Sequence, residues 1–274
     1  MVETIPNTTN PAAVDLLEKQ RMQIHYSLLV FLLPLRKGVV VLMRPIVKIC
    51  GMTRSDDIRM CIHYGAKVIG IVVEYPEPVP WSVDVCTAGE LVAACGDTAK
   101  SCIVSDGSHA KLVRLAHLLQ PNYIQTSFGG AVEEIDRLVN NLQNCGATKL
   151  IVAISPQTPL EKTIELSKTG ITALLLDPRT SRNAVIGGIA EPHRFKCVQD
   201  TVNCSVILAG GLNSSNIELM VRLSQAQMID VMTGVEGSPG VKDESKVSSL
   251  FRNLPTLRLK TNQQKRSYLN ERNL

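Results

Sequence analysis

From residue 46 onward, short runs rich in valine and isoleucine recur along the chain and alternate with longer, more polar stretches. Eight such runs occur, at residues 46–50, 67–73, 100–104, 122–126, 149–154, 171–176, 205–209 and 228–233. Continuous apolar runs with little polar alternation are typical of strands buried on both faces, as in a parallel sheet covered by helices. The pattern therefore predicts eight buried parallel strands.

The stretches between these runs carry helix signals. Ser55 precedes the acids Asp56 and Asp57, and Gly65 ends the same stretch, which predicts an N-cap, a negatively charged first turn and a C-terminal stop. Ser108 precedes a segment whose apolar residues fall on one face of a helix. The pattern is weakest after residue 176, because the segment that follows is loop-like and the helix predicted from Pro192 to Thr201 has poor periodicity.

Eight strand-and-helix units in roughly 210 residues match a (β/α)8 barrel, whose usual size is roughly 200–250 residues. An open, doubly wound sheet is the structural alternative. It fits less well, because no G-x-G-x-x-G motif follows the first strand and the units are nearly uniform in length. We therefore predict an α/β fold that forms a single (β/α)8 TIM barrel over residues 43–254.

The residues outside this range differ in character. An apolar run at 27–35 is about half of the roughly 20 residues that a membrane span needs, and Arg36 and Lys37 follow it, whereas a signal peptide carries its cations first. We expect residues 1–42 to be a poorly ordered N-terminal extension. Residues 255–274 hold five cations and one acid, which predicts a solvated basic C-terminal tail.

Composition and charge narrow the function. The 274-residue chain has 45% hydrophobic and 20% charged residues, as globular proteins do. Much of its net charge of +4 lies in the tail, and a near-neutral body argues against a nucleic-acid partner. Eight cysteines occur without a C-x-x-C pair, several of them in apolar runs. We therefore expect reduced thiols in a cytoplasmic protein, with no metal site and no membrane partner.

In a TIM barrel the chemistry lies at the carboxyl ends of the strands. Cys50 ends the first predicted strand and Asp177 follows the sixth. A cysteine in an apolar run is more often part of the core than a catalyst. A carboxyl group at a barrel mouth is partly desolvated, which can raise its pKa toward the range of a general acid.

Glycine-containing turns follow the seventh and eighth strands, as Gly210-Gly211 and Thr233-Gly234. Glycine lets backbone N–H groups approach an anion, and the N-terminus of the next helix adds partial positive charge. Phosphate sites recur at these two strands of TIM barrels. The two turns therefore predict a small, phosphorylated substrate.

The stretch 48–54, KICGMTR, resembles the K-x-C-G-x-T/R opening of the phosphoribosylanthranilate isomerase family, the (β/α)8 enzymes of tryptophan biosynthesis. Further matches follow in order at 65–66, 69–70, 175–177, 187–188, 208–212, 230–236, 239–240 and 242–243. The resemblance covers about residues 45–252, and the order of the motifs is far more specific than any one of them. The chain is identified as a member of this family.

The resemblance implies an Amadori rearrangement of N-(5-phosphoribosyl)anthranilate to 1-(2-carboxyphenylamino)-1-deoxyribulose 5-phosphate, without a cofactor. The reaction needs an acid at the ring oxygen and a base at C2, and by resemblance Asp177 is the acid and Cys50 the base. A thiol needs help to act as a thiolate, from Lys48 or from amides of the site. The residues expected to bind the substrate and its phosphate are Gly188, Gly210, Gly211, Asp230, Thr233 and Gly234.

One loop departs from the family pattern. Members usually present S-P-R after the second strand, and that arginine binds the anthranilate carboxylate, but here residues 74–81 read EYPEPVPW. Two glutamates replace a cation, so an anionic ring substituent would be repelled unless a cation from another loop binds it. The candidates for this carboxylate clamp are Arg54, Arg179 and Arg182. The family's Q-L-H-G motif is also altered, to QTSFG at 125–129.

The acid, the base and the phosphate loops are kept, whereas the residues that would contact the aglycone differ. This favours a phosphoribosylanthranilate isomerase with a relocated clamp, acting as a monomer or homodimer. Two alternatives are a barrel isomerase for a different phosphorylated aminosugar and a non-catalytic barrel that binds a sugar phosphate. Retention of Cys50 and Asp177 argues against the last, because a binding protein has no use for that pair.

Overall fold

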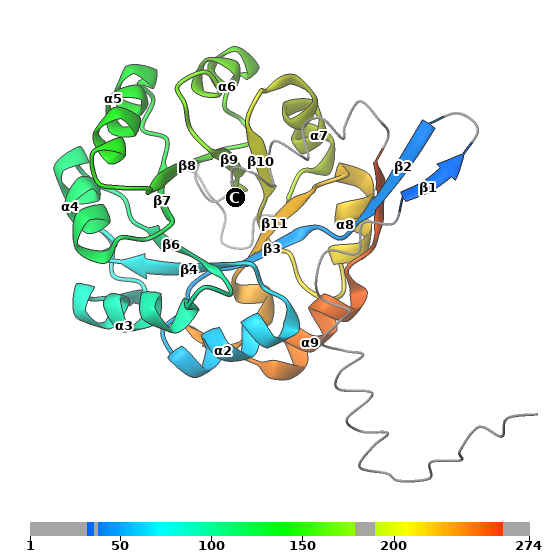
Figure 1. Ribbon diagram of the computed structural model, residues 1–274, viewed down its shortest axis with the longest axis horizontal. Helices are drawn as coiled ribbons and strands as arrows, with labels where there is room; N and C mark the ends of the chain where they lie inside the picture. The colour runs from blue at the N-terminus through cyan, green and yellow to red at the C-terminus, as the bar shows by residue number, and fades with distance from the viewer. Residues whose placement is uncertain (1–31, 36–37, 179–189, 260–274) are drawn as a thin grey trace, which may run out of the picture.

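The computed structural model describes residues 32–35, 38–178 and 190–259. Within these residues, eight parallel strands close into a barrel: β3 (Ile46–Ile49), β4 (Val68–Val73), β6 (Lys100–Val104), β7 (Tyr123–Ser127), β8 (Lys149–Ile154), β9 (Ala173–Leu176), β10 (Ser205–Leu208) and β11 (Met228–Val231). Each strand pairs with the next, and β3 pairs with both β11 and β4 (Figure 1). The ring therefore closes, and the predicted (β/α)8 barrel is confirmed.

A helix follows each barrel strand on the outside of the ring: α2 (Ser55–Tyr64), α3 (Val85–Cys95), α4 (His109–Leu119), α5 (Val132–Gln143), α6 (Leu160–Leu166), α7 (Pro192–Thr201), α8 (Ile217–Ser224) and α9 (Glu244–Asn253). Ser108 caps α4 as predicted, because its side chain accepts a hydrogen bond from the Lys111 N–H. Gly65 ends α2 with a φ of 114°. The N-cap predicted at Ser55 shifts by one residue, because Ser55 is already helical and the extended Arg54 precedes it.

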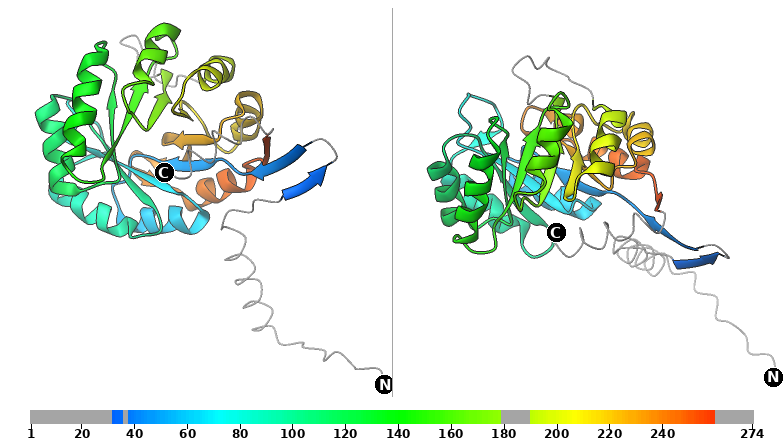
Figure 2. Two further views of the ribbon diagram at one scale, coloured as in Figure 1. Left: turned by 45° about the horizontal axis from the view of Figure 1, so that its top comes forward. Right: turned by 90° about the horizontal axis from the view of Figure 1, so that it is seen from above.

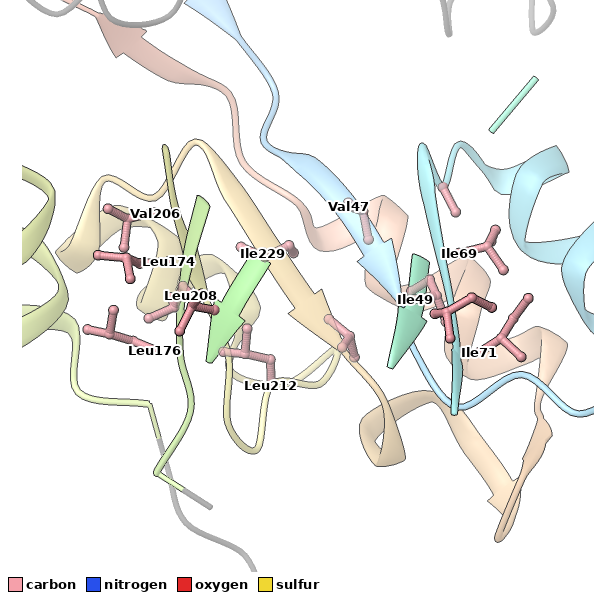
Figure 3. Close-up of a cluster of buried hydrophobic side chains, with 14 of the residues drawn as sticks. Val47, Ile49, Ile69, Ile71, Leu174, Leu176, Val206, Leu208, Leu212 and Ile229 are labelled. Atoms are coloured by element: carbon pink, nitrogen blue, oxygen red, sulfur yellow. The ribbon is translucent and has the colours of Figure 1, made fainter. Parts of the chain in front are cut away.

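Side chains alternate along each barrel strand between the helices and the barrel interior. The outward set forms the main core, and Figure 3 shows part of it, labelled as Val47, Ile49, Ile69, Ile71, Leu174, Leu176, Val206, Leu208, Leu212 and Ile229. The inward set fills the barrel and includes Val68, Cys102, Tyr123, Ile151, Leu175, Ile207 and Met228. Because both faces of the strands are covered, their sequences read as continuous apolar runs.

A second, antiparallel sheet joins segments from near the two ends of the chain. β1 (Leu32–Leu35) and β2 (Gly38–Met43) form a hairpin, and β14 (Leu257–Leu259) pairs with the other edge of β2. Figure 2 shows the hairpin beside the barrel. Strand β14 and all of β2 except Met43 lie in the ranges expected to be an extension and a tail, so these two ranges meet in one sheet. The pairing partners are too distant in sequence for local patterns to reveal them.

Shorter elements lie in the loops at the carboxyl ends of the barrel strands, which we call the barrel mouth. β5 (Ser82–Val83) pairs with the end of β4, the 3-10 helix η2 (Thr233–Val235) follows β11, and β12 (Glu236–Ser238) pairs with β13 (Val241–Lys242). These elements shape the loops that carry the candidate site. None of the helices in the described part of the chain has the length and apolarity needed to cross a bilayer.

Candidate active site at the barrel mouth

Cys50 lies at the carboxyl end of β3, where it is buried. Its N–H donates to the Val231 carbonyl oxygen at 2.9 Å, which ties this end of β3 to β11. A Cβ atom placed on Gly70 of β4 would lie 2.7 Å from the Cys50 Sγ. Only a glycine therefore leaves room for the thiol, because the two strands run side by side at this point.

Two residues earlier on β3, Lys48 has no exposed surface, and its Nζ lies 3.0 Å from Oδ1 of Asp230 on β11. Burial has the largest single effect and lowers the pKa of Lys48, but the Asp230 carboxylate, together with the Cys50 and Cys102 thiols, raises it by more, so the pKa lies above its ordinary value. Burial raises the pKa of the Cys50 thiol, and the Lys48 ammonium opposes the rise. The candidate base thus has a charged neighbour inside the barrel.

Asp177 follows β9 at the same end of the barrel and is 7% exposed. Its N–H donates to the Ile154 carbonyl oxygen at 3.1 Å, which continues the β8–β9 pairing to the strand end. Because side chains alternate along β9 and Leu175 faces the interior, Asp177 faces the mouth. Strands β11 and β10 lie between β3 and β9, so the thiol and the carboxyl group approach the mouth from different sides.

The two predicted glycine turns lie against each other on β10 and β11. Gly210 and Gly211 have φ values of 104° and 61°, a region that favours glycine. A Cβ on Gly234 would lie 1.9 Å from the Leu212 carbonyl oxygen, so the second turn fits against the first only without a side chain. Gly211 and Thr233 are exposed at the mouth. Gly188, expected to bind the same phosphate, lies outside the described residues.

An apolar patch borders the thiol on the side of β4. Cys50, Val72 and Met232 form a buried cluster, and the partly buried side chains that pack against it are Tyr75, Val79, Trp81 and Val104. Three of these come from the loop 74–81, which departs from the family pattern. The patch offers an apolar surface of the kind that an aromatic ring would cover.

Glu74, one of the two glutamates of this loop, has a cationic partner that the sequence did not reveal. Arg114 of α4 forms an ion pair with Glu74, and Lys111 donates to the Glu74 carbonyl oxygen and, at 3.0 Å, to that of Asp106. Glu74 adopts a φ of 44°, which is uncommon for a residue with a side chain. The charge of Glu74, one of the two glutamates expected to repel an anionic substituent, is therefore compensated by Arg114.

Asp106, which follows β6, adds a second carboxylate on this side of the mouth. It accepts hydrogen bonds from the Tyr75 hydroxyl at 2.9 Å and the Thr126 hydroxyl at 3.0 Å. The N–H and hydroxyl of Ser127 also donate to it, at 2.6 and 2.9 Å. The altered QTSFG segment thus supplies three donors to one carboxylate, and Tyr75 connects this network to the loop 74–81.

The candidate clamp residues are only partly covered by the structure. Arg54 is exposed and immediately precedes α2, in the loop that begins with Cys50, so it lies on the rim of the mouth. Arg179 and Arg182 lie outside the described residues. Within the described ranges, no cluster of three or more His, Cys, Asp or Glu side chains is arranged to hold a metal ion.

The closed barrel, with a thiol, a carboxyl group and two glycine turns at the carboxyl ends of its strands, defines the class of protein as a (β/α)8 barrel with a candidate active site at its mouth. Residues 47–253 match the family model described as N-(5'phosphoribosyl)anthranilate (PRA) isomerase. The chain belongs to this family. The family and the isomerase class expected from the sequence are confirmed.

Individual relatives agree with this assignment. The N-(5'-phosphoribosyl)anthranilate isomerase of Halorubrum lacusprofundi is 31% identical over 211 residues, which cover 76% of this chain and 95% of that protein. The crystal structure of the Thermus thermophilus phosphoribosyl anthranilate isomerase is 25% identical with a TM-score of 0.63, over 76% of this chain and 97% of that one.

A further solved structure shares the fold at 20% identity and a TM-score of 0.61, over 76% of this chain and 97% of its own. It is described as phosphoribosyl anthranilate isomerase in complex with reduced 1-(o-carboxyphenylamino)-1-deoxyribulose 5-phosphate.

Proposed function

We propose that this chain catalyses the Amadori rearrangement of N-(5-phosphoribosyl)anthranilate in tryptophan biosynthesis, with Asp177 as the general acid and Cys50 as the general base. The observation that carries the proposal is the order of groups around the mouth. The thiol follows β3 and the carboxyl group follows β9, and the glycine turns of β10 and β11 lie between them. A phosphorylated sugar bound at the turns would have one group on each side of its ring.

In the first step, Asp177 protonates the ring oxygen of the ribose. The bond between that oxygen and C1 breaks, the ring opens, and the nitrogen lone pair forms a C=N bond to C1. The carboxyl group must be protonated for this step and near enough to the mouth to meet the substrate. Its position directly after β9 brings it to the mouth, where the substrate would bind.

In the second step, Cys50 removes the proton from C2. The C2–H bond breaks, its electrons form a C1=C2 bond and neutralise the C=N nitrogen, and an S–H bond forms. The resulting enol becomes the aminoketose, so atoms and electrons balance without a redox partner. The active form of Cys50 is the thiolate, and burial raises the thiol pKa while the Lys48 ammonium opposes that rise.

The rest of the substrate is assigned by chemistry. The backbone of the glycine turns would hold the phosphate, with Gly188, Gly210, Gly211, Thr233 and Gly234 as the residues concerned. Backbone amides need no metal to bind a phosphate. The aromatic aglycone would cover the apolar patch beside Cys50. We propose Arg54, with Arg179 and Arg182, as the clamp for its carboxylate. A contact between Asp230 and the substrate stays a prediction.

The test is the loss of anthranilate-type fluorescence when purified protein meets phosphoribosylanthranilate generated in place. We expect turnover in the native chain and a loss of about a hundredfold or more in Asp177→Asn and in Cys50→Ala, with circular dichroism spectra unchanged. Cys86→Ala is the matched control, because that cysteine is exposed on α3. Full turnover in either site variant would contradict the assigned role. Unfolding of either variant would indicate a core residue.

A different phosphorylated aminosugar is the second candidate substrate. It is favoured by the Asp106 carboxylate, which accepts hydrogen bonds from hydroxyl and N–H donors on the side of the mouth where the aglycone would lie. If the native chain binds ribose 5-phosphate but does not consume phosphoribosylanthranilate, this alternative or the non-catalytic one replaces the proposal. The cytoplasmic location and the monomeric or homodimeric state stay predictions.

A further inference from the structure

We infer that Lys48 is a positioning residue that makes Cys50 easier to deprotonate, and that Asp230 acts through Lys48 by keeping it charged and in place. The inference rests on the proposed function only in taking Cys50 as the base. It gives Asp230 a role different from the substrate contact expected from the sequence.

The backbone places these three side chains together. Lys48 and Cys50 are two residues apart on β3, so both point into the barrel. Asp230 is the register partner of Lys48 on β11, and their charged atoms are 3.0 Å apart. Gly70, on the other neighbour of β3, contributes no side chain that would separate Cys50 from the interior. The Lys48 ammonium is therefore enclosed in the barrel interior, on the same face of β3 as the thiol.

The orientation of the ion pair decides its effect on Cys50. A paired ammonium and carboxylate are neutral together, so a neighbour responds mainly to the nearer end. The groups whose charges act on the thiol are Lys48, Asp230 of β11 and Lys242 of β13. Burial has the largest effect and raises the pKa of Cys50; among the charges, Lys48 lowers it most, ahead of the opposing effect of Asp230. The ammonium therefore acts on the thiol more strongly than the carboxylate does.

Stability alone does not account for this pair. A buried ion pair contributes little net stability, because removing two charges from water costs about as much as their attraction returns. The surrounding interior positions are filled by apolar side chains such as Ile151, Ala173 and Ile207, so an apolar pair would suit the same space. A charged pair placed next to the candidate base has a chemical use that an apolar pair would lack.

The test measures alkylation of Cys50 by iodoacetamide as a function of pH, with peptide mass spectrometry as the readout. The main variant is Lys48→Gln with Asp230→Asn, which replaces the ion pair by two amides of similar size. We expect Cys50 of this variant to be alkylated about tenfold more slowly at pH 8, with the midpoint of the pH curve moved upward. Exposed Cys86 in the same molecule reports the reactivity of the reagent.

This experiment separates two properties of Cys50, its accessibility to the reagent and its affinity for a proton. A change in access scales the alkylation rate equally at every pH, whereas a change in proton affinity moves the midpoint. An unmoved midpoint in a folded variant would overturn the inference. Lys48→Met with Asp230→Asn is a second charge-free pair with the same expectation.

If neither double variant folds, Lys48→Arg decides, because it keeps the positive charge. The inference is supported if the proton concentration at the midpoint of the alkylation curve differs from the native value by less than about threefold. A displacement of about tenfold contradicts it. The measurement needs no turnover. If the Cys50→Ala variant remained fully active, Cys50 would not be the base and the proposed function would fail in that respect. The alkylation curves of the chains that retain Cys50 would still show whether Lys48 eases its deprotonation. Failure of the proposed function and failure of this inference are therefore distinguishable.

Discussion

The two halves of the barrel mouth differ in what forms their surface, which is backbone on one half and side chains on the other. On β10 and β11, backbone turns form the surface, and Gly210, Gly211 and Gly234 are required by φ values above zero or by contacts that exclude a side chain. On β4, β6 and β7, side chains form it: Glu74 is held by α4, and Asp106 collects donors from two neighbouring loops.

This difference explains which half keeps the family motifs. A backbone site depends on conformation, and few residues other than glycine can occupy its positions. A side-chain site can be rebuilt by exchanging partners, provided that each buried polar group still finds one. The structure accordingly retains the glycine turns, while the loop 74–81 and the segment 125–129 are altered together and hydrogen-bond to the same aspartate.

The largest expected effect comes from Gly234→Ala. Its Cβ would lie 1.9 Å from the Leu212 carbonyl oxygen and would force the two turns apart. We expect kcat/KM to fall by about a hundredfold, inhibition by inorganic phosphate to weaken, and stability to fall by about 1–3 kcal/mol. Gly237→Ala is the control, because its nearest neighbour would be 3.5 Å away. Unchanged phosphate inhibition in Gly234→Ala would disprove a backbone-built phosphate site.

The next effect is the pH dependence of inactivation by a thiol reagent, which concerns the aglycone side because Cys50 lies there. The thiolate is the reactive form, and burial raises the thiol pKa above its ordinary value. At pH values below that pKa, the rate at which iodoacetamide inactivates the enzyme should therefore rise about tenfold per pH unit, and the rise should continue beyond about pH 8.5, the ordinary cysteine value. Residual turnover, assayed at one fixed pH after exposure to the reagent from pH 6.5 to 9.5, measures this without involving Asp177. A plateau reached before pH 8 would mean that the base is not this buried thiol.

A smaller effect is expected from Arg54→Met. Removing this cation should raise KM for phosphoribosylanthranilate by about tenfold, since it deletes one charge-assisted contact to the aglycone carboxylate. Inhibition by inorganic phosphate should not change, which separates the two halves of the mouth. Arg59→Met is the control, because Arg59, on the helix that follows Arg54, pairs with the exposed Asp56. Equal KM values for the two variants would remove Arg54 from the proposed clamp.

Sequence patterns predicted the barrel well because a strand buried on both faces has a local signature. The predicted run at 149–154 coincides with β8, and the poorly periodic stretch from Pro192 to Thr201 is α7. The pairing of β2 with β14 was not predicted, because each strand is short and its partner lies at the other end of the barrel sequence.

The same limit applies to the site. Cys50, Asp177 and the glycine turns each follow a recognisable strand, so their meeting at one end of the barrel was predictable. The pairing of Lys48 with Asp230, 182 residues away, and that of Glu74 with Arg114, 40 residues away, depend on packing between distant segments. No local pattern encodes such partners, and the role expected for Glu74 changed once its partner was known.

The smallest expected effect tests whether the side-chain half behaves as one network. Tyr75→Phe removes one of the donors to Asp106 but keeps the ring that packs beside Cys50. We expect KM to rise by about threefold and phosphate inhibition to stay unchanged, because Asp106 retains its other donors and a single hydrogen bond contributes about 1 kcal/mol. Tyr64→Phe, which removes a hydroxyl bonded to Glu244, is the control. If Tyr75→Phe instead abolished turnover, the loop 74–81 would depend on that one hydroxyl, and the aglycone side would be as intolerant of change as the glycine turns.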